Sequence, residues 1–391
     1  MLNYNIEMHI LILPSFYPEK NTPVNGLFFK NQSKVLVDKT DKVGTVYTEQ
    51  KSLKKIFSDA GDHLYQTTRE VDEGILTYRT HGISLLNQFP IGAAIWVKVT
   101  LALVKKYIEE NGKPDIIHAH NVFNAGRVAR ACLSMYGIPY VVTEHDSGYL
   151  LNEYSSKALK VAKEVFNNSA CNIAVSKSLG LAISTSCNLS FVKVIPNVVD
   201  ISLFELDFSK RREEVFKFIS VGNLLKNKGH EVLIKAFSVF QKDRSNAVLE
   251  IYGEGPEYEN LNQLIKQLNL TEAVSLKGKI APIALVKRYQ QSHCLVLPSF
   301  RETFGVVIIE AMACGLPVIA TRSGGPEDII NDENGILVDP GDIESMAKAL
   351  TGIKDNHHKY NFNNIRKFVE KNYSENIVAN SLLSLYKTIG G

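Results

Sequence analysis

The segment Pro298–Thr321 constrains the fold more than any other part of this 391-residue chain. An apolar run before it, Cys294–Leu297, is typical of a buried strand, and the run ends in a polar loop. A helix is expected to begin near Phe304 or Gly305, and a second buried strand at Val318–Ala320. A strand–loop–helix–strand unit of this kind belongs to a parallel sheet. It points the unpaired amides of the helix start toward the carboxyl edge of that sheet, where phosphates are held.

The same alternation of short Val- and Ile-rich runs with helical patterns continues through the whole chain. The expected strands of the first half are His9–Leu13, Val43–Tyr47, Ile75–Thr80, Asp115–Ala119, Tyr140–Thr143, Cys171–Ala174 and Phe191–Ile195. Those of the second half are Lys217–Val221, Ala247–Tyr252, Ala273–Leu276, His293–Leu297, Pro317–Ala320 and Gly335–Val338. This pattern predicts an α/β protein with two parallel sheets, each covered on both faces by helices. We therefore expect two Rossmann-like domains that face each other across a cleft.

The length of the chain also favours two domains, because one core seldom organises more than about 250–300 residues. The turn Ile195–Asp200 is the expected junction. It separates an N-terminal domain, residues 1–196, from a C-terminal domain, residues 197–373, and a last helix lies in residues 374–391. No stretch reaches the roughly 20 apolar residues of a membrane span. The longest candidate, Ile91–Val104, is interrupted by Lys98 and is expected to be a core helix.

Two carboxylates follow Pro298. Glu302 lies in the loop, and Glu310 lies in the helix after it. Glu310 lies inside an otherwise apolar helix, so it either has a polar partner or lies on the one solvated stripe of that helix. Eight helical residues span about 12 Å. The carboxyl pairs of glycosidases lie roughly 5–9.5 Å apart. We therefore expect the two carboxylates to contact different parts of one ligand.

Glycine-rich turns follow several of the expected strands. The turn Val221–Gly229 precedes a helix over His230–Phe240, and Lys226 and Lys228 in this turn supply charge for a diphosphate. A second turn, Tyr252–Pro256, is either beside a nucleotide or simply a turn into the next helix. The loop Pro18–Gly26 precedes a helix over Leu27–Val37, and Gly26 either lets the backbone donate to a phosphate or is simply a helix-entry turn.

Three histidines lie at the ends of two expected strands. His118 and His120 close one strand, and His145 follows the next in the sequence Glu144-His145-Asp146. Residues two apart on a strand share a face, so a metal site, a structural role and an active-site role all remain open for the His-x-His pair. No cysteine or further histidine has a suitable metal-ligand spacing, and the chain contains no D-x-D triplet.

The motif Glu-Thr-Phe-Gly-x4-Glu-Ala-Met-Ala-x-Gly-x-Pro-Val, which begins at Glu302, resembles the E-x7-E signature of the retaining glycosyltransferases of family 4. The stretches Ser323-Gly-Gly-Pro-Glu-Asp-Ile-Ile and Asn334-Gly-Ile-Leu-Val look like the next two motifs of that family. The resemblance covers most of the chain. It implies the GT-B fold, in which the last helix, residues 374–391, crosses back to the N-terminal domain. It also implies a nucleoside-diphosphate sugar (UDP- or GDP-linked) as donor, no metal ion, and transfer with retention of the anomeric configuration.

The resemblance also implies roles for individual residues. It assigns Glu302 and His120 to catalysis at the transferred sugar and Glu310 to the ribose hydroxyls. Lys228 matches a family lysine at the donor phosphates, whereas Asn223 replaces the family's arginine, and Lys226 is the candidate substitute. The expected donor-binding residues are Gly26, Gly222, Asn223, Lys226, Lys228, Gly253, Lys279, Thr303, Phe304, Gly305 and Glu310; His145 is the expected acceptor residue.

Bacterial relatives of this kind extend lipid-linked oligosaccharides for surface polysaccharides, which implies a saccharide acceptor carried by undecaprenyl diphosphate. Residues 1–196, expected to receive the acceptor, carry 21 basic and 17 acidic residues, and the whole chain has a net charge of +3. No nucleic-acid partner is expected. Lys51, Lys54 and Lys55 alternate with apolar residues, a pattern that suits either contact with an anionic membrane or an ordinary solvated segment.

The cysteines and the N-terminal residues indicate the cellular compartment of the protein. Five cysteines without paired spacing indicate a reducing cytoplasm. Residues 1–14 lack the basic region and cleavage site of a signal peptide, and Met8 is as good a start as Met1. We therefore expect a cytoplasmic protein; the membrane contact left open for Lys51, Lys54 and Lys55 would be peripheral, on the inner face of the cytoplasmic membrane.

Three functions other than sugar transfer are alternatives for a chain of this kind. A nicotinamide-dependent dehydrogenase needs a G-x-G-x-x-G after its first strand, and the loop Leu13–Gly26 has none. A sugar-nucleotide epimerase or hydrolase would share the fold. A non-catalytic nucleotide-sugar-binding protein would bind the donor without turnover.

Overall fold

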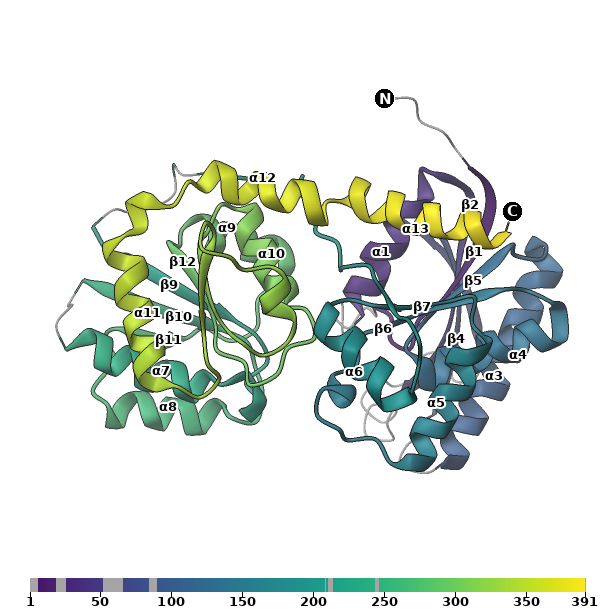
Figure 1. The fold of residues 1–391 in the computed structure, drawn as a ribbon, viewed down its shortest axis with the longest axis horizontal. Helices are drawn as coiled ribbons and strands as arrows, with labels where there is room; N and C mark the ends of the chain where they lie inside the picture. The colour runs from purple at the N-terminus through teal and green to yellow at the C-terminus, as the bar shows by residue number, and fades with distance from the viewer. Residues whose placement is uncertain are drawn as a thin grey trace. The chain divides into compact units, whose positions relative to one another are not determined.

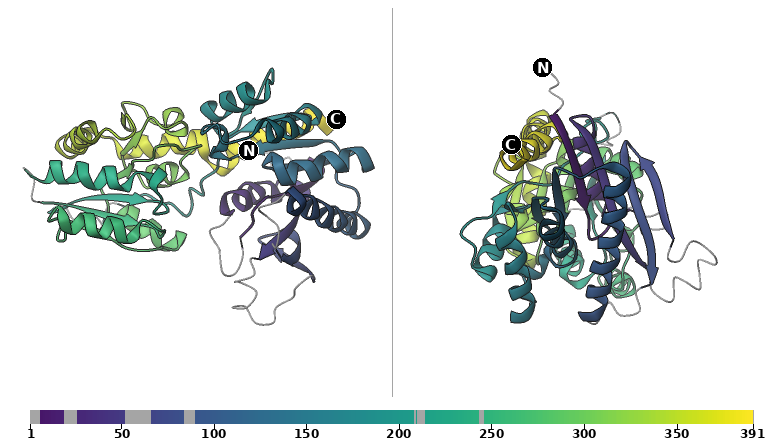
Figure 2. Two further views of the ribbon diagram at one scale, coloured as in Figure 1. Left: turned by 90° about the horizontal axis from the view of Figure 1, so that it is seen from below. Right: turned by 90° about the vertical axis from the view of Figure 1, so that its right-hand side faces the viewer.

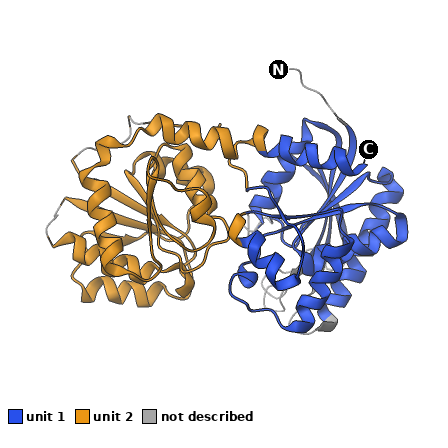
Figure 3. Ribbon diagram, in the orientation of Figure 1, with its two compact units in different colours: residues 1–175, 179–196, 378–391 blue, residues 176–178, 197–377 orange. Residues whose placement is uncertain are grey.

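The computed structural model describes residues 6–18, 26–51, 66–83, 90–207, 209, 214–242 and 246–390. Two compact units make up the chain, and Figure 3 colours them separately. Unit 1 comprises residues 1–175, 179–196 and 378–391, and unit 2 comprises residues 176–178 and 197–377. The C-terminal residues thus belong to the same unit as the N-terminal half. Lys54 and Lys55 lie outside the described residues, as does the side chain of Lys51.

Unit 1 is built on an eight-stranded sheet with the order β3-β4-β2-β1-β5-β6-β7-β8. Its strands are β1 (Ile6–Leu13), β2 (Thr40–Lys51), β3 (Thr67–Asp72), β4 (Ile75–Ile83), β5 (Ile116–His120), β6 (Tyr140–Glu144), β7 (Cys171–Ala174) and β8 (Lys193–Val194). Neighbouring strands are parallel except for the β3–β4 hairpin. The strand β3 was not predicted, because most of its residues are exposed and it has no apolar run.

Helices cover both faces of this sheet (Figures 1 and 2). They are α1 (Leu27–Val37), α3 (Pro90–Asn111), α4 (Arg127–Tyr136), α5 (Ser156–Asn168), α6 (Lys177–Cys187) and α13 (Glu375–Gly390). The helices α1 and α13 share one face, since Phe29 of α1 contacts His120 and Tyr386 of α13 contacts His118. The helices α3 and α5 cover the opposite face, where Tyr107 contacts His9. The segment predicted as a core helix is part of α3.

Unit 2 contains a six-stranded parallel sheet with the order β11-β10-β9-β12-β13-β14. Its strands are β9 (Phe216–Val221), β10 (Ala247–Tyr252), β11 (Val274–Leu276), β12 (Cys294–Leu297), β13 (Val318–Thr321) and β14 (Gly335–Val338). Its helices are α7 (His230–Gln241), α8 (Tyr258–Gln267), α9 (Pro282–Gln290), α10 (Val306–Ala313), α11 (Ile343–Asp355) and α12 (Phe362–Tyr373). An aliphatic and phenylalanine core joins the sheet to α7, α8 and α11. The prediction of two parallel Rossmann-like sheets is confirmed.

The strand order decides where a ligand can bind. In unit 2 the chain proceeds outward from β9 to β11 and then returns to the other side of β9 as β12. The loops that follow β9 and β12 therefore emerge side by side at the carboxyl edge of the sheet, at a topological switch point where ligands of such folds bind. In unit 1 the same reversal lies between β1 and β5. Among the described helices, none has the length and apolar character needed to cross a membrane.

Candidate active site

The glycine–lysine turn after β9 contacts the loop that follows β12. Lys226–Lys228 forms a single 3₁₀ turn, and Gly229 then begins α7 with φ = 70°. A Cβ atom at position 229 would lie 2.1 Å from the carbonyl oxygen of Pro298. The amide of Phe300 donates to the carbonyl of Asn227 at 2.8 Å. Glycine at 229 is therefore needed for the two loops to approach each other.

This approach brings Lys228 and Glu302 together. The Nζ atom of Lys228 lies 2.7 Å from Oε2 of Glu302, and the two side chains are 24% and 14% exposed. Backbone hydrogen bonds fix Glu302 itself: its amide donates to the carbonyl of Ser323 at 2.9 Å, and its carbonyl accepts from the amide of Gly325 at 2.7 Å. The motif that begins at Ser323 thus holds the carboxylate loop in place. Lys226 and Asn223 are exposed on the same turn.

The second carboxylate, Glu310, has a partner that the sequence did not identify. The hydroxyl of Tyr289, a fully buried residue of α9, donates to Oε2 of Glu310 at 3.2 Å. Burial raises the pKa of Glu310 to about 7, and the bond from Tyr289 opposes that rise. Glu310 therefore has a polar partner, and it also lies on the partly exposed stripe of α10 with Val306 and Val307. No local pattern could have indicated Tyr289, because it lies on another helix.

The helix that carries Glu310 begins at the carboxyl edge of the sheet. Gly305 precedes α10 in the left-handed conformation, with φ = 91°, and its carbonyl accepts from the amide of Ile308 at 2.8 Å. Phe304 is buried and Thr303 is partly exposed. Apart from the amide of Ile308, the amides of the first helical turn have no acceptor within the helix. They are available to an anionic ligand at this edge.

The glycine turns after β9, β10 and β11 are linked by backbone hydrogen bonds. The amide of Gly222 donates to the carbonyl of Tyr252 at 3.0 Å, and the amide of Gly253 donates to the carbonyl of Gly278 at 2.9 Å. Lys279 extends from the last of these turns and pairs with the exposed Glu254 at 3.2 Å. The structure thus brings Gly222, Gly253 and Lys279 to one edge but directs the Lys279 ammonium group to a surface carboxylate.

In unit 1, the backbone conformation and the close packing at position 26 both require glycine. Gly26 has φ = 72°, and a Cβ atom there would lie 2.6 Å from the carbonyl oxygen of Phe16. Its own carbonyl accepts from the amides of Phe29 and Lys30 at 3.0 and 3.3 Å. Residues 19–25 of the preceding loop lie outside the described residues.

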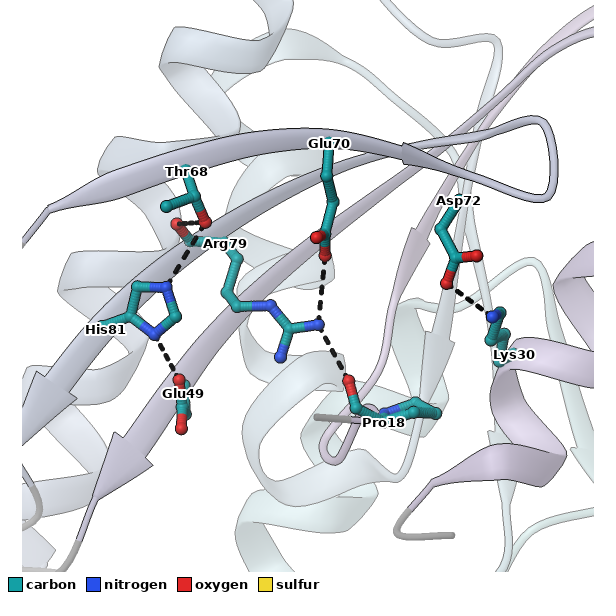
Figure 4. A network of polar contacts seen from close by, with 8 residues as sticks. All are labelled: Pro18, Lys30, Glu49, Thr68, Glu70, Asp72, Arg79 and His81. Carbon is teal, nitrogen blue, oxygen red and sulfur yellow. Dashed lines mark hydrogen bonds and ion pairs between the residues drawn. The ribbon is translucent and has the colours of Figure 1, made fainter. Parts of the chain in front are cut away.

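A polar network holds the beginning of that loop (Figure 4). Arg79 of β4 donates from Nη2 to the carbonyl of Pro18 at 2.8 Å and to Glu70 at 3.3 Å. Its guanidinium group also lies over the rings of Tyr17 and Tyr47, 5.8 and 5.6 Å from their centroids. Arg79, Glu70 and the two tyrosines had no predicted role. They tie Pro18 to the β3–β4 hairpin.

The three histidines of unit 1 form one cluster. Nδ1 of His120 lies 3.2 Å from Nε2 of His145, and the His118 ring is stacked on the His120 ring with centroids 4.3 Å apart. Phe29 packs against His120 and His145 at centroid distances of 4.8 and 4.9 Å. Burial lowers the pKa of His118 and His145 to about 3 and that of His120 well below its usual value. All three imidazoles are therefore neutral at pH 7.

Two nitrogens of the cluster have no hydrogen-bond partner within the part of the chain that the structure describes: Nε2 of His120 and Nδ1 of His145. A buried polar atom without a partner is costly, so a ligand group that could bond to these nitrogens would bind favourably. The described residues contain no group of three or more His, Cys, Asp and Glu side chains that could hold a metal ion.

Glu144 supports the turn that carries His145. Its buried carboxylate accepts hydrogen bonds from the amides of Val122, His145 and Asp146 at 3.0, 2.9 and 3.0 Å. Burial raises the pKa of Glu144 to about 7, whereas the three amides favour the ionised form. Sequence reasoning placed Glu144 at the end of a strand but assigned it no function.

The chain has two Rossmann-like sheets, and a lysine turn meets a carboxylate loop at the switch point of the second sheet. These features define a glycosyltransferase of the GT-B class. The chain belongs to the retaining glycosyltransferases of group 1 and family 4. The family "Glycosyl transferases group 1" matches residues 204–372, and "Glycosyltransferase Family 4" matches residues 58–203. The predicted family is therefore confirmed.

Two relatives illustrate the similarity in sequence. The uncharacterized glycosyltransferase MJ1607 of Methanocaldococcus jannaschii is 32% identical over 301 residues, which cover 70% of this chain and 75% of that protein. The putative teichuronic acid biosynthesis glycosyltransferase TuaC of Bacillus subtilis is 27% identical over 366 residues, which cover 88% of each chain.

Solved structures show the same fold at lower identity. Sucrose-phosphate synthase from Thermosynechococcus elongatus matches with a TM-score of 0.77 and 20% identity, over 97% of this chain and 99% of that one. Anabaena Alr3699/HepE in complex with UDP and glucose matches with a TM-score of 0.72 and 21% identity, over 97% and 99% of the two chains. Both similarities establish the fold.

Proposed function

We propose that this enzyme transfers a hexose, with retention of configuration, from a nucleoside-diphosphate sugar to a saccharide acceptor in the synthesis of a surface polysaccharide such as O-antigen, capsule or exopolysaccharide. The observation that carries the proposal is the pairing of Lys228 with Glu302 at the switch point of unit 2. A cation for the diphosphate and a carboxylate for the sugar stand next to each other there, as they must to contact adjacent parts of one donor.

Each part of the donor is assigned to residues of this site. Lys228, together with the amide of Asn223 next to Gly222 and the amides at the start of α10, stabilises the negative charge that develops on the departing nucleoside diphosphate. Glu302 contacts hydroxyls of the transferred sugar. Glu310 accepts hydrogen bonds from the ribose hydroxyls. Because lysine and helix amides supply positive charge, we expect transfer without a metal ion, and chelation with EDTA should leave the rate unchanged.

His120 is assigned to the transferred sugar and His145 to the acceptor. Support comes from the two unpartnered nitrogens of these side chains, which can each bond to a sugar hydroxyl. His120→Ala should lower turnover while the thermal midpoint of unfolding stays close to that of the wild type. Wild-type turnover in this variant would leave His120 with a structural role only.

A screen of UDP- and GDP-sugars identifies the donor class. A thermal-shift measurement detects binding, and release of the nucleoside diphosphate with and without a saccharide acceptor detects turnover. Acceptor-dependent release supports a transferase. Release without an acceptor would favour an epimerase or hydrolase, and a thermal shift without any turnover would favour a non-catalytic binding protein. HepE, of the same fold, holds UDP and glucose, which makes UDP-glucose the first donor to test.

A lipid-linked acceptor is the second part of the proposal. The relative TuaC is named as a putative teichuronic acid biosynthesis glycosyltransferase, which supports a polysaccharide pathway for this chain. An acceptor carried by undecaprenyl diphosphate would bring the enzyme to the cytoplasmic membrane, where each Lys near an anionic surface contributes about 1 kcal/mol. Lys51, Lys54 and Lys55 are the proposed contacts. Vesicle co-sedimentation should depend on anionic lipid and salt, and equal recovery on neutral lipid would favour a water-soluble acceptor.

A further inference from the structure

His118 is hydrogen-bonded on both sides of its ring. Its Nδ1 lies 2.6 Å from the hydroxyl of Tyr386 on the C-terminal helix α13, and its Nε2 lies 2.7 Å from the hydroxyl of Thr143 on β6. Both His118 and Tyr386 are fully buried. Two hydrogen bonds at opposite ends of an imidazole fix its ring plane. The first of them comes from a residue that is 268 positions away in the chain.

The hydrogen bonds also select one tautomer of His118. A neutral imidazole has one N–H donor and one acceptor nitrogen. Burial raises the pKa of the Tyr386 phenol, so this group keeps its proton and donates it. Because a phenol is a stronger donor than the Thr143 alcohol, Tyr386 donates to Nδ1 and the Nε2–H of His118 donates to Thr143. Removal of the phenol oxygen would therefore leave Nδ1 as a buried acceptor without a donor.

The His118 ring in turn supports His120. The two rings are stacked with an interplanar angle of 28°, Phe29 contacts His120 at an interplanar angle of 40°, and His145 bonds to its Nδ1. The ring of His120 thus has a defined plane and a defined rotation within that plane. Only its Nε2 is left for a ligand among the described residues. Any rotation of the His118 ring would change the ring face against which His120 is stacked.

We propose that Tyr386 of the C-terminal helix is a positioning residue for sugar transfer: its hydroxyl holds His118, and the stacked His118 ring sets the orientation of His120. This inference rests on the role of His120 at the transferred sugar under the proposed function. It gives the C-terminal helix a part in the chemistry of unit 1 in addition to packing.

The test compares Tyr386→Phe with Tyr107→Phe. Tyr107 is a matched control because it is also fully buried, and its hydroxyl lies 2.7 Å from Nε2 of His9 on the opposite face of the same sheet. One readout is the nitrogen NMR signals of the imidazoles in protein labelled with ¹⁵N-histidine, assigned by single substitutions among the ten histidines. The other is kcat and the donor KM for transfer from the donor identified by the screen.

We expect Tyr386→Phe to shift the signals of His118 and His120, and to lower kcat about 10- to 100-fold, the effect of a small misplacement of a reacting group. The donor KM should change much less than kcat, since the residues assigned to the nucleoside diphosphate at Lys228 and Glu310 lie in unit 2. Tyr107→Phe should change neither the His120 signal nor kcat. Thr143→Val removes the other hydroxyl and should shift the same two signals, so it serves as the test if Tyr386→Phe does not fold.

Unchanged His120 signals in the folded variant would overturn the inference, and so would a wild-type kcat. The NMR readout is independent of catalysis. If the His120 signal moves but His120→Ala keeps wild-type turnover, the coupling between the rings stands and the role of His120 in transfer is wrong. The two failures are therefore distinguishable.

Discussion

The ammonium group of Lys228 lies 2.7 Å from the carboxylate of Glu302, so the two side chains assigned to the phosphates and to the sugar of one donor are paired with each other. A donor that places its diphosphate beside Lys228 must share or replace this ion pair. The pair orders both side chains while no donor is present, which under the proposed roles reduces the ordering cost on binding.

Lys228→Ala should weaken binding of the nucleoside diphosphate by about 1.5–3 kcal/mol, the scale of a hydrogen bond to a charged group. Binding of the free nucleoside should change little, because it has no phosphate. Isothermal titration with both ligands measures the difference. Lys226→Ala, on the same turn but exposed, is the matched comparison. If the nucleoside and the diphosphate lose affinity equally, Lys228 does not contact the phosphates.

Glu302→Gln should lower kcat while the affinity for the nucleoside diphosphate stays equal or increases. The substitution removes the negative charge that Lys228 now neutralises, so the lysine has more of its charge available for the phosphates. Steady-state rates and titration of the diphosphate measure the two effects. Glu254→Gln, which alters the exposed partner of Lys279, is the control. A loss of diphosphate affinity in Glu302→Gln would show that this carboxylate positions Lys228 instead of the sugar.

The affinity for a nucleotide sugar should rise with pH through the neutral range. Glu310 has a pKa of about 7 in the unliganded protein, and ribose hydroxyls donate to its ionised form, so binding lowers this pKa and releases a proton. Since only the ionised fraction binds well, affinity at pH 6 should be about tenfold weaker than above pH 8. A nucleotide sugar is the suitable probe, because its diphosphate is esterified at both ends and does not titrate in this range.

Glu310→Gln serves as the control for that measurement. Its side chain has no charge to lose, so its affinity should be weaker than that of the wild type and independent of pH between 6 and 8. An identical pH dependence in both proteins would assign the titration to another group.

Gly229→Ala should destabilise unit 2 more than Gly278→Ala. Both glycines have a positive φ, 70° and 72°, so alanine at either position carries the same backbone cost of about 1–2 kcal/mol. A Cβ atom at 229 would also lie 2.1 Å from the Pro298 oxygen, whereas at 278 no heavy atom lies within 4 Å. We expect an additional loss of about 1–3 kcal/mol at 229 from that overlap.

Thermal unfolding measures the difference in stability between the two variants, and donor titration measures their affinity for the donor. Gly229→Ala should also weaken donor binding, because the turn that carries Lys228 must move away from the loop that carries Glu302. Equal midpoints for the two variants would mean that the turn relaxes without strain.

Much of the fold followed from local patterns. The strands β9–β14 were predictable because each is a short apolar run flanked by glycine or polar turns, and the parallel arrangement followed from the helices between them. The hairpin strand β3 was missed, because its side chains are exposed and its pairing with β4 depends on the turn at Glu73 and Gly74, where φ is 50° and 80°. The spacing of Glu302 and Glu310 and the motifs around them indicated the family.

The sequence by itself therefore determined the class of fold, the family and the residues that carry charge or glycine at the strand ends. Only the tertiary structure decided which of these groups meet: Lys228 with Glu302, Tyr289 with Glu310, and Tyr386 with His118. A helical or strand pattern arises from residues close together in the chain, whereas these contacts join residues 74, 21 and 268 positions apart. Their proximity depends on the strand order, which sets the loops that emerge together at one edge, and on the face of the sheet that each helix covers.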